Sequence, residues 1–285
     1  MAMNVGLGLP VGGLDALPEW ARRAEDGPFS SLGLVDRLVY DNPEPLVTLA
    51  ALAGATSRIR VMTEVLIAPM RPTALMAKEL ATLDRLSGGR LTVGIGVGAR
   101  EDDFLAMGAE HRRRGRRLDE QMAALRRVWA GRPYGEGIGP IGPAPSRPGG
   151  PEVLFGGFVQ ATAERVARWG DGLMASTLPP EEMDRLFRMV EESWERAGRP
   201  GRPRLVAQAN AALGPEAVLD EARRAAGGYY AFLDSGETRV EGMLTSREAI
   251  RGAVRAFGDV GADELMLYCW SADPAQVDRI AAALP

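Results

Sequence analysis

The stretch AKELATLDRLSGGRLTVGIGVG, residues 77–98, carries the clearest information about the fold of this 285-residue chain. Apolar residues recur at helical spacing in its first half, and the glycine pair at residues 88–89 ends that helix. Residues 91–97 then form a largely apolar run, which is typical of a strand buried on both faces. A helix followed at once by such a strand indicates a parallel sheet covered by helices.

The same alternation of strand-like and helix-like segments runs along the whole chain. A closed (β/α)8 TIM barrel takes about 250 residues, so the length favours this α/β fold over an open doubly wound sheet. We therefore predict a single TIM-barrel domain over residues 1–285. Its eight strands, each followed by at least one helix, are expected at residues 4–9, 32–36, 59–67, 91–97, 153–155, 173–175, 204–213 and 264–269.

Two segments depart from this alternation of strands and helices. Residues 131–151 are rich in glycine and proline and follow the fourth main helix, predicted at residues 114–130. A long irregular segment of this kind predicts either an ordered active-site loop or a mobile flap. An insertion also lies between a helix at residues 216–226 and residue 245, before strand eight. The alternation resumes after each segment, so neither is interpreted as a domain boundary.

Charge and cysteine content restrict the class of protein. The net charge is −4 and the pI about 5.4, whereas a nucleic-acid-binding domain normally carries a basic stripe. The basic run at residues 112–117 is followed at once by Asp119 and Glu120, so we interpret it as the solvated start of a helix. Cys269 is the only cysteine, which excludes an internal disulfide and fits a reducing compartment. No apolar run reaches the ~20 residues of a membrane span, so the expected location is the cytoplasm.

The sequence is poor in residues for metal or nucleophilic chemistry. One histidine, His111, and one cysteine cannot build the histidine-rich metal centres of barrel hydrolases. A Ser–His–Asp triad would need His111, which directly precedes three arginines near a helix start. No metal site is predicted, and such a chain suits chemistry carried by an organic cofactor.

The active site of a TIM barrel lies at the carboxyl ends of its strands. This rule selects a short set of candidate positions, which are residues 9–10, 36–37, 63–67, 98–101, 156–157, 175–176, 268 and 270. Within strand four, Gly94, Gly96 and Gly98 follow a period of two and are expected on one face. They either leave space for a flat ring inside the barrel or make room for bulky neighbouring side chains.

A second pair of glycines ends strand five. Gly156 and Gly157 precede a helix start, where free backbone N–H groups attract phosphate and glycine permits close approach. Arg100, just past strand four, could contact the same phosphate. Its alternative is a surface ion pair with Glu101 or Asp102.

Several segments together resemble the bacterial luciferase-like flavin-dependent oxidoreductases over nearly the whole chain. The most specific is the combination of LDRLSGGR with GxGxG at residues 83–98. The other matching segments are DRLVY (36–40), SRIRV (57–61), REDDFLAMG (100–108), RGRRLDEQMAALRRVWAG (114–131), VLFGGF (153–158), ARWGDGLM (167–174), AGRPGRPRLV (197–206) and ADELMLY (262–268).

This resemblance implies a TIM barrel that binds FMN or coenzyme F-420, a 5-deazaflavin, at its mouth. It also implies a bulge in strand three, often with a non-proline cis peptide, which supports the ring from behind. The cofactor-binding residues expected by position are Glu64, Val65, Gly96, Gly98, Ala99, Arg100, Gly156, Gly157 and Phe158.

One position departs from the family pattern. Many members carry a histidine after the aspartate that ends strand two, where this chain has Arg37. Arginine cannot act as a general base, so Arg37 is expected to stabilise an anionic reduced cofactor, to bind an acidic substrate, or to pair with Asp36 or Asp41. Glu64 would be costly to bury without a partner, so it should face the mouth and either meet Arg37 or line a wet pocket. Arg37, Glu64 and Asp36 are the candidate catalytic residues.

The predicted function is redox chemistry on a small organic substrate, either hydride transfer with the deazaflavin or monooxygenation with reduced FMN. Three features slightly favour the deazaflavin, which are the short length of the chain, the turn predicted at residues 96–104 and the arginine-rich composition. The rival interpretation, which the arginine at position 37 supports, is a non-catalytic flavin-binding barrel protein. The expected partners are the substrate and the cofactor, with a homodimer as an option, and not nucleic acid or a membrane.

Overall fold

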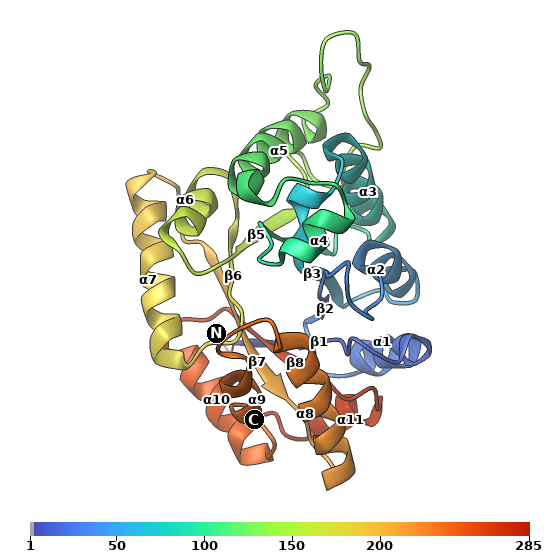
Figure 1. The fold of residues 1–285 in the computed structure, drawn as a ribbon, viewed down its shortest axis with the longest axis vertical. Coiled ribbons are helices and arrows are strands. Elements are labelled where there is room, and N and C mark those ends of the chain that lie inside the picture. The colour runs from blue at the N-terminus through green and yellow to red at the C-terminus, as the bar shows by residue number, and fades with distance from the viewer. Residues whose placement is uncertain (1–2) are drawn as a thin grey trace.

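The computed structural model describes residues 3–285 and confirms the predicted (β/α)8 TIM barrel. All neighbouring strands are parallel, and the sheet closes by pairing of the first strand with the last. Figure 1 shows the helices arranged around the strands. The strands are β1 (Asn4–Gly8), β2 (Ser31–Leu34), β3 (Arg60–Ile67), β4 (Leu91–Gly96), β5 (Glu152–Gly156), β6 (Gly172–Met174), β7 (Arg204–Ala211) and β8 (Glu264–Cys269).

The helices follow the predicted order with two differences. The stretch between strand four and the next long helix contains a short helix, and the insertion before strand eight is largely helical. The helices are α1 (Leu17–Asp26), α2 (Pro45–Gly54), α3 (Thr73–Leu86), α4 (Glu101–Ala106), α5 (Arg114–Trp129), α6 (Gln160–Trp169), α7 (Pro180–Arg196), α8 (Glu216–Tyr230), α9 (Gly236–Glu241), α10 (Arg247–Asp259) and α11 (Ala275–Ala281). Among the described residues, no helix is long and apolar enough to cross a membrane.

Buried side chains lie on both faces of the barrel sheet because successive side chains of a strand point to opposite faces. Val93 and Ile95 of β4 point outward and are fully buried in the large cluster between strands and helices. A smaller cluster fills the inside of the barrel and consists of Met62, Leu154, Met174, Val206 and Met266. The barrel interior below the mouth is therefore packed with side chains and does not form a channel.

Charged side chains close the lower end of the barrel, at the amino ends of the strands. Arg204 forms ion pairs with both Glu152 and Glu264. Arg60 donates to Glu152 at 3.0 Å, and the Ser30 hydroxyl donates to Glu264. Every carboxylate of this lower-end network, which comprises Arg60, Glu152, Arg204 and Glu264, therefore has a cationic partner.

The prediction that residues 131–151 form an active-site loop is wrong, because none of these residues lines the mouth cavity. The segment joins α5 to the start of β5, and a connection from a helix to a strand lies at the lower end of a TIM barrel. It packs against α3, where Lys78 donates to the Gly142 carbonyl at 2.8 Å and Asp84 accepts from the Ser146 amide at 2.6 Å. In Figure 1 the loop projects beyond α3 and α5, away from the strands.

Candidate functional site

A cavity of about 450 Å³ opens at the carboxyl ends of the strands. The loops after β2, β4, β5 and β6 contribute to its walls, together with the segment around the end of α8. Every site residue expected from the sequence lines it, namely Asp36, Arg37, Glu64, Val65, Gly96, Gly98, Ala99, Arg100, Gly156, Gly157 and Phe158. The structure thus brings together residues that span more than a hundred positions of the chain.

The floor of the cavity is the bulge in β3, which confirms the prediction for Glu64 and Val65. The register of β3 against β4 shifts between Thr63 and Leu66, and the Glu64–Val65 peptide is cis. A Cβ atom on Gly96 would lie 2.7 Å from the Val65 side chain, and one on Gly156 would lie 2.8 Å from it. The two glycines therefore make room for Val65, which presents a branched apolar surface to the cavity.

This arrangement favours the second alternative for the strand-four glycines, which is that they make room for neighbouring side chains. Gly94 does point inward, but an added Cβ would lie 2.1 Å from the Thr63 carbonyl oxygen and 2.8 Å from the Met174 Sδ, so no space is free beside it. Gly98 lies beyond the end of β4 with a φ of 77°, so it does not share the face of Gly94 and Gly96. The glycines leave no bare slot for a ring. They position Val65 and the backbone against which a ring could lie.

Glu64 points into the barrel and not toward the helices, as expected, and is 7% exposed. The expected pair with Arg37 does not form. Glu64 Oε2 accepts from the Gln208 amide at 3.4 Å, and its Oε1 has no hydrogen-bond partner among the described residues. Burial, with a smaller contribution from the Glu264 charge, raises the pKa of Glu64 well above its usual range. Burial therefore favours the protonated form of this carboxyl, which lines the cavity.

Asp36 is a candidate catalytic residue, and both of its carboxylate oxygens accept hydrogen bonds from neighbouring groups. Its Oδ2 accepts from the Ile67 amide at 2.8 Å, and Arg71 donates to both of its oxygens at 3.1 and 3.2 Å. The carboxylate therefore fixes the end of β3, directly after the bulge. These contacts fit a role for Asp36 in positioning the floor of the cavity.

Arg37 is buried, at 8% exposure, and pairs with neither Asp36 nor Asp41, so that expectation is wrong. Its Nη1 donates to the Tyr229 carbonyl at 3.0 Å, and its Nε has no acceptor in the described chain. The guanidinium carbon lies 4.1 Å from the centre of the Tyr40 ring. Burial lowers the pKa of Arg37, and the positive charge of Arg100 lowers it further. Arginine nevertheless stays charged near neutral pH, so a buried cation faces the cavity.

Arg100 adopts the ion pair with Asp102 that was the alternative to a phosphate contact. Its Nε remains without a hydrogen-bond partner and lies 3.8 Å from Asp103 Oδ2. The other oxygen of Asp103 accepts the amides of Leu38 and Val39 at 3.1 and 2.7 Å. Asp103 thus joins the loop that carries Arg37 to the helix that follows Arg100.

The segment from Tyr229 to Arg239 covers part of the mouth, and the sequence did not identify its side chains as site residues. Tyr229, Tyr230, Phe232 and Arg239 all line the cavity. Asn210 of β7 holds the segment, because its Oδ1 accepts from the Tyr230 hydroxyl at 3.2 Å and its Nδ2 donates to the Arg239 carbonyl at 3.0 Å. The cluster of aromatic residues in GGYYAF (227–232) was the available signal, because the rest of the insertion is mainly polar.

The start of α6 forms the opposite corner of the cavity. The helix has no side-chain cap, so its first backbone N–H groups are available to a ligand. Gly157 has a φ of 145°, and an added Cβ would lie 2.4 Å from the Thr162 hydroxyl oxygen, so glycine is required there. Phe158, at 45% exposure, forms the rim. Arg165 also lines this corner, although Asp119 already accepts from its Nε at 2.9 Å.

These features fit a flavin-type coenzyme. Val65 offers an apolar floor for one face of a ring, and the unpartnered Glu64 Oε1 and Arg37 Nε can serve polar ring atoms. The uncapped start of α6 suits a phosphate group. No group of three or more histidine, cysteine or acidic side chains within residues 3–285 could hold a metal ion.

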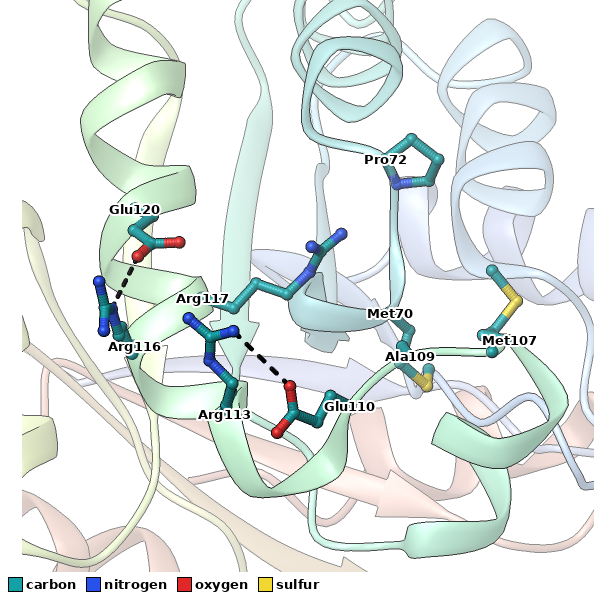
Figure 2. Close-up of a pocket in the computed structure, with 10 residues that line it drawn as sticks. Met70, Pro72, Met107, Ala109, Glu110, Arg113, Arg116, Arg117 and Glu120 are labelled. Carbon is teal, nitrogen blue, oxygen red and sulfur yellow. Dashed lines mark hydrogen bonds and ion pairs between the residues drawn. The ribbon is translucent and has the colours of Figure 1, made fainter.

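A second hollow, of about 410 Å³, lies outside the mouth at the start of α5 (Figure 2). It includes part of the basic run at residues 112–117. Arg116 pairs with Glu120 at 2.9 Å, Arg113 with Glu110 at 3.8 Å, and Arg117 donates to the Pro69 carbonyl at 2.6 Å. These partners agree with the interpretation of the run as a solvated helix start.

Sequence relatives support the assignment to a family. A region of 164 residues is 36% identical to an uncharacterized protein of Mycobacterium tuberculosis and covers 55% of this chain and 56% of that protein. Another region, of 142 residues, is 34% identical to an FMNH2-dependent dimethylsulfone monooxygenase of Pseudomonas putida, over 46% of this chain and 39% of that enzyme. The matched part is thus about half the length of the first of these relatives and less of the second.

Solved structures share the fold over nearly the full length. An F420-dependent secondary alcohol dehydrogenase has a TM-score of 0.85 at 19% identity, covering 100% of this chain and 99% of that one. The oxygenating constituent of 3,6-diketocamphane monooxygenase from Pseudomonas putida, in complex with FMN, has a TM-score of 0.77 at 17% identity, covering 99% and 97%.

The family model for luciferase-like monooxygenases matches residues 3–282, which is almost the entire chain. The barrel, the bulged β3 and the mouth cavity agree with that match. The chain therefore belongs to the luciferase-like monooxygenase family.

Proposed function

We propose that this chain is a flavin- or deazaflavin-dependent oxidoreductase that acts on a small organic substrate at the barrel mouth, with hydride transfer by coenzyme F-420 as the leading reaction. The observation that carries this proposal is the bulge in β3, which places both Val65 and Glu64 in the lining of the cavity. Family membership and the similarity in fold to an F420-dependent alcohol dehydrogenase support it.

When bound, the deazaflavin would supply or accept a hydride at the substrate carbon. The residues that would hold it are Val65 against the ring and the start of α6, with Gly157, at the phosphate. Asp36 keeps the floor in place through the Ile67 amide. The aromatic side chains of Tyr229, Tyr230 and Phe232 line the mouth and would limit the access of water to a bound ring.

Glu64 would act as the proton donor and acceptor. A carbonyl that receives a hydride leaves an alkoxide oxygen that needs a proton, and the reverse reaction needs a base. Burial raises the pKa of the Glu64 carboxyl and favours its protonated form, and its Oε1 is not engaged by another group among residues 3–285. Arg37 takes no part in proton transfer because its guanidinium does not release a proton near neutral pH.

Monooxygenation with reduced FMN is the second candidate, favoured by the 34% identity to the FMNH2-dependent dimethylsulfone monooxygenase. A deazaflavin does not activate oxygen as a flavin does, so the identity of the coenzyme distinguishes the two reactions. Neither the family match nor the relatives with named activities support the non-catalytic alternative.

The test is titration of the purified protein with FMN and with coenzyme F-420, monitored by fluorescence quenching. We expect saturable binding of at least one coenzyme, with the deazaflavin bound more tightly. Val65→Ala should weaken that binding about tenfold, since about two buried CH2 equivalents are lost from the floor. Val47→Ala is the matched control, because Val47 is exposed on α2 and lies outside the cavity. If neither coenzyme binds, or if both variants bind like wild type, the proposal is wrong.

A further inference from the structure

The mouth carries more positive charge than a neutral substrate requires. Five arginines line the cavity, against three acidic residues. Of the three acids, Asp36 is engaged by Arg71 and a backbone amide, Asp103 accepts two backbone amides and lies 3.8 Å from Arg100, and Glu64 is buried and has no cationic partner among the described residues. Arg100 and Arg165 pair with Asp102 and Asp119, which leaves Arg37, Arg114 and Arg239 without a carboxylate partner among residues 3–285.

Arg37 is a buried arginine that has no negatively charged partner among the described residues. Its side chain is buried, yet its two described hydrogen bonds go to the backbone carbonyls of Tyr229 and Val39. Its Nε has no acceptor, and it forms no salt bridge with any residue from 3 to 285. A buried guanidinium without a counter-ion is costly, and burial lowers its pKa accordingly. A ligand anion would supply the missing partner.

The surroundings of Arg37 also define the shape of the site. The rings of Tyr40, Tyr229 and Phe232 lie 4.1, 5.2 and 5.5 Å from the guanidinium carbon. The Arg100 guanidinium lies 4.9 Å from the same Phe232 ring, and its Nε is also unpartnered. Two planar cations thus meet at one aromatic side chain, which fixes their orientation and adds an apolar wall.

This place differs from the corner assigned to the coenzyme phosphate. Arg37 follows β2 and Arg100 follows β4, whereas the uncapped helix start follows β5. The phosphate corner has its own donors in the α6 backbone, with Arg165 nearby. An anion at Arg37 and Arg100 is therefore additional to the phosphate, and it lies beneath the segment that covers the mouth.

We propose that the region between Arg37, Arg100 and Phe232 binds the carboxylate of a small organic acid with an apolar body, which is the substrate class of this enzyme. The proposal rests on the function proposed above. A planar carboxylate can accept from the Nε edge of Arg37, while the apolar body packs on Phe232 and Tyr229.

The test compares benzoate and benzamide, two probes of nearly equal shape of which only benzoate is charged at neutral pH. Calorimetric titration of the protein saturated with its coenzyme should give at least about tenfold tighter binding of benzoate, as one charge-assisted contact predicts. This comparison needs only the wild-type protein, so it stands even where a variant fails to fold.

Arg37→Met, which keeps the length of the side chain and removes its charge and donors, should abolish the preference for benzoate. Arg37→Lys, which keeps the charge without the planar fork, should retain part of it. Arg188→Met is the matched control, because it removes one exposed arginine of α7, far from the mouth, and should leave the preference unchanged.

The other outcomes overturn the inference in distinguishable ways. Equal binding of the two probes to wild type, or an unchanged preference in Arg37→Met, rejects the carboxylate site. If benzoate and the coenzyme compete, or if Arg37→Met weakens coenzyme binding as much as benzoate binding, Arg37 serves the coenzyme, and only the proposed function survives. If no coenzyme binds, the proposed function fails, and benzoate preference in the coenzyme-free protein still decides whether Arg37 forms an anion site.

Discussion

At the lower end of the barrel, Arg204 lies between Glu152 and Glu264 and Arg60 adds a further contact to Glu152, whereas at the mouth Glu64 and Arg37 have no charged partner in residues 3–285. The same residue types are buried at both ends. Burial alone would raise the pKa of Glu152, but Arg204, the Thr92 hydroxyl and Arg60 outweigh it, and the pKa is lowered. At Glu64 nothing opposes burial, and the pKa is raised.

This difference separates a structural role from a functional one. A fully paired ionic network specifies how the strands close and gains nothing from a ligand. Unpaired groups lower the stability of the free protein, and they persist where a ligand or a reaction uses them. The comparison therefore assigns stability to the lower end and chemistry to the mouth, and the following predictions test that assignment.

The largest effect is expected on turnover when the Glu64 carboxyl is replaced by a group that cannot transfer a proton. Glu64→Gln keeps the size of the side chain and its contact with Gln208 but cannot transfer a proton. We expect turnover of a reducible substrate to fall by about 10²- to 10⁴-fold, as general acid–base catalysis predicts, with coenzyme affinity changed little. Steady-state kinetics and coenzyme titration on the same preparation measure both. Turnover within threefold of wild type would remove Glu64 from the mechanism.

Breaking the lower-end network should affect stability and leave binding intact. Arg204→Met leaves Glu264, which is fully buried, without its cation, and we expect a loss of about 3–5 kcal/mol in the free energy of unfolding. Urea denaturation measures this loss. The exposed pair of Arg188 and Asp184 provides the control, because Arg188→Met should cost less than about 1 kcal/mol. A coenzyme affinity that fell along with stability would argue against the separation of roles.

The two ends should also give opposite dependences of stability on pH. The pKa of Glu64 is raised in the folded state, so deprotonation of this carboxyl opposes folding. The free energy of unfolding is therefore unaffected by Glu64 below its ordinary pKa, near 4.5, and declines as the pH rises above that value. Because the pKa of Glu152 is lowered, its contribution is present above the ordinary value and is lost as pH falls.

Glu64→Gln should therefore raise Tm relative to wild type at alkaline pH. Glu152→Gln should reduce the decrease in Tm that wild type shows as the pH falls. For a domain of this size each kcal/mol corresponds to a shift of about 2–4 °C. Thermal melts from pH 4 to pH 9 provide the measurement. An unchanged pH profile in Glu64→Gln would show that its carboxyl titrates normally in the folded protein.

The smallest effect is expected in the loop at residues 131–151. Replacing residues 135–140 with glycine and serine at constant length keeps the Asp84 contact with Ser146 and alters nothing at the mouth. Tm should shift by no more than about 2–4 °C, and coenzyme affinity should stay the same. A marked loss of coenzyme binding would mean that the loop reaches the site after all.

The sequence alone determined the fold and part of the lining of the mouth cavity. Alternating helical and apolar segments specify a parallel barrel, and the rule that TIM-barrel sites lie at the carboxyl ends of strands selected residues that do line one cavity. The same topology rule already places residues 131–151 at the lower end, since they precede a strand. Their glycine-rich composition suggested an active-site loop because composition carries no information about which end of the barrel a loop occupies.

Only the tertiary structure decided the partners of the charges. Arg37 follows Asp36 in sequence, yet Asp36 pairs with Arg71 and Arg37 contacts Tyr229, which is almost two hundred positions away. Glu64 meets Gln208 across the barrel. The period of two in a strand predicts which face of the sheet a side chain occupies. The partner of a charged side chain depends instead on which strands lie opposite it in the closed barrel and on how the segment after β7 packs at the mouth. These long-range placements determine whether a buried charge is neutralised or left for a ligand.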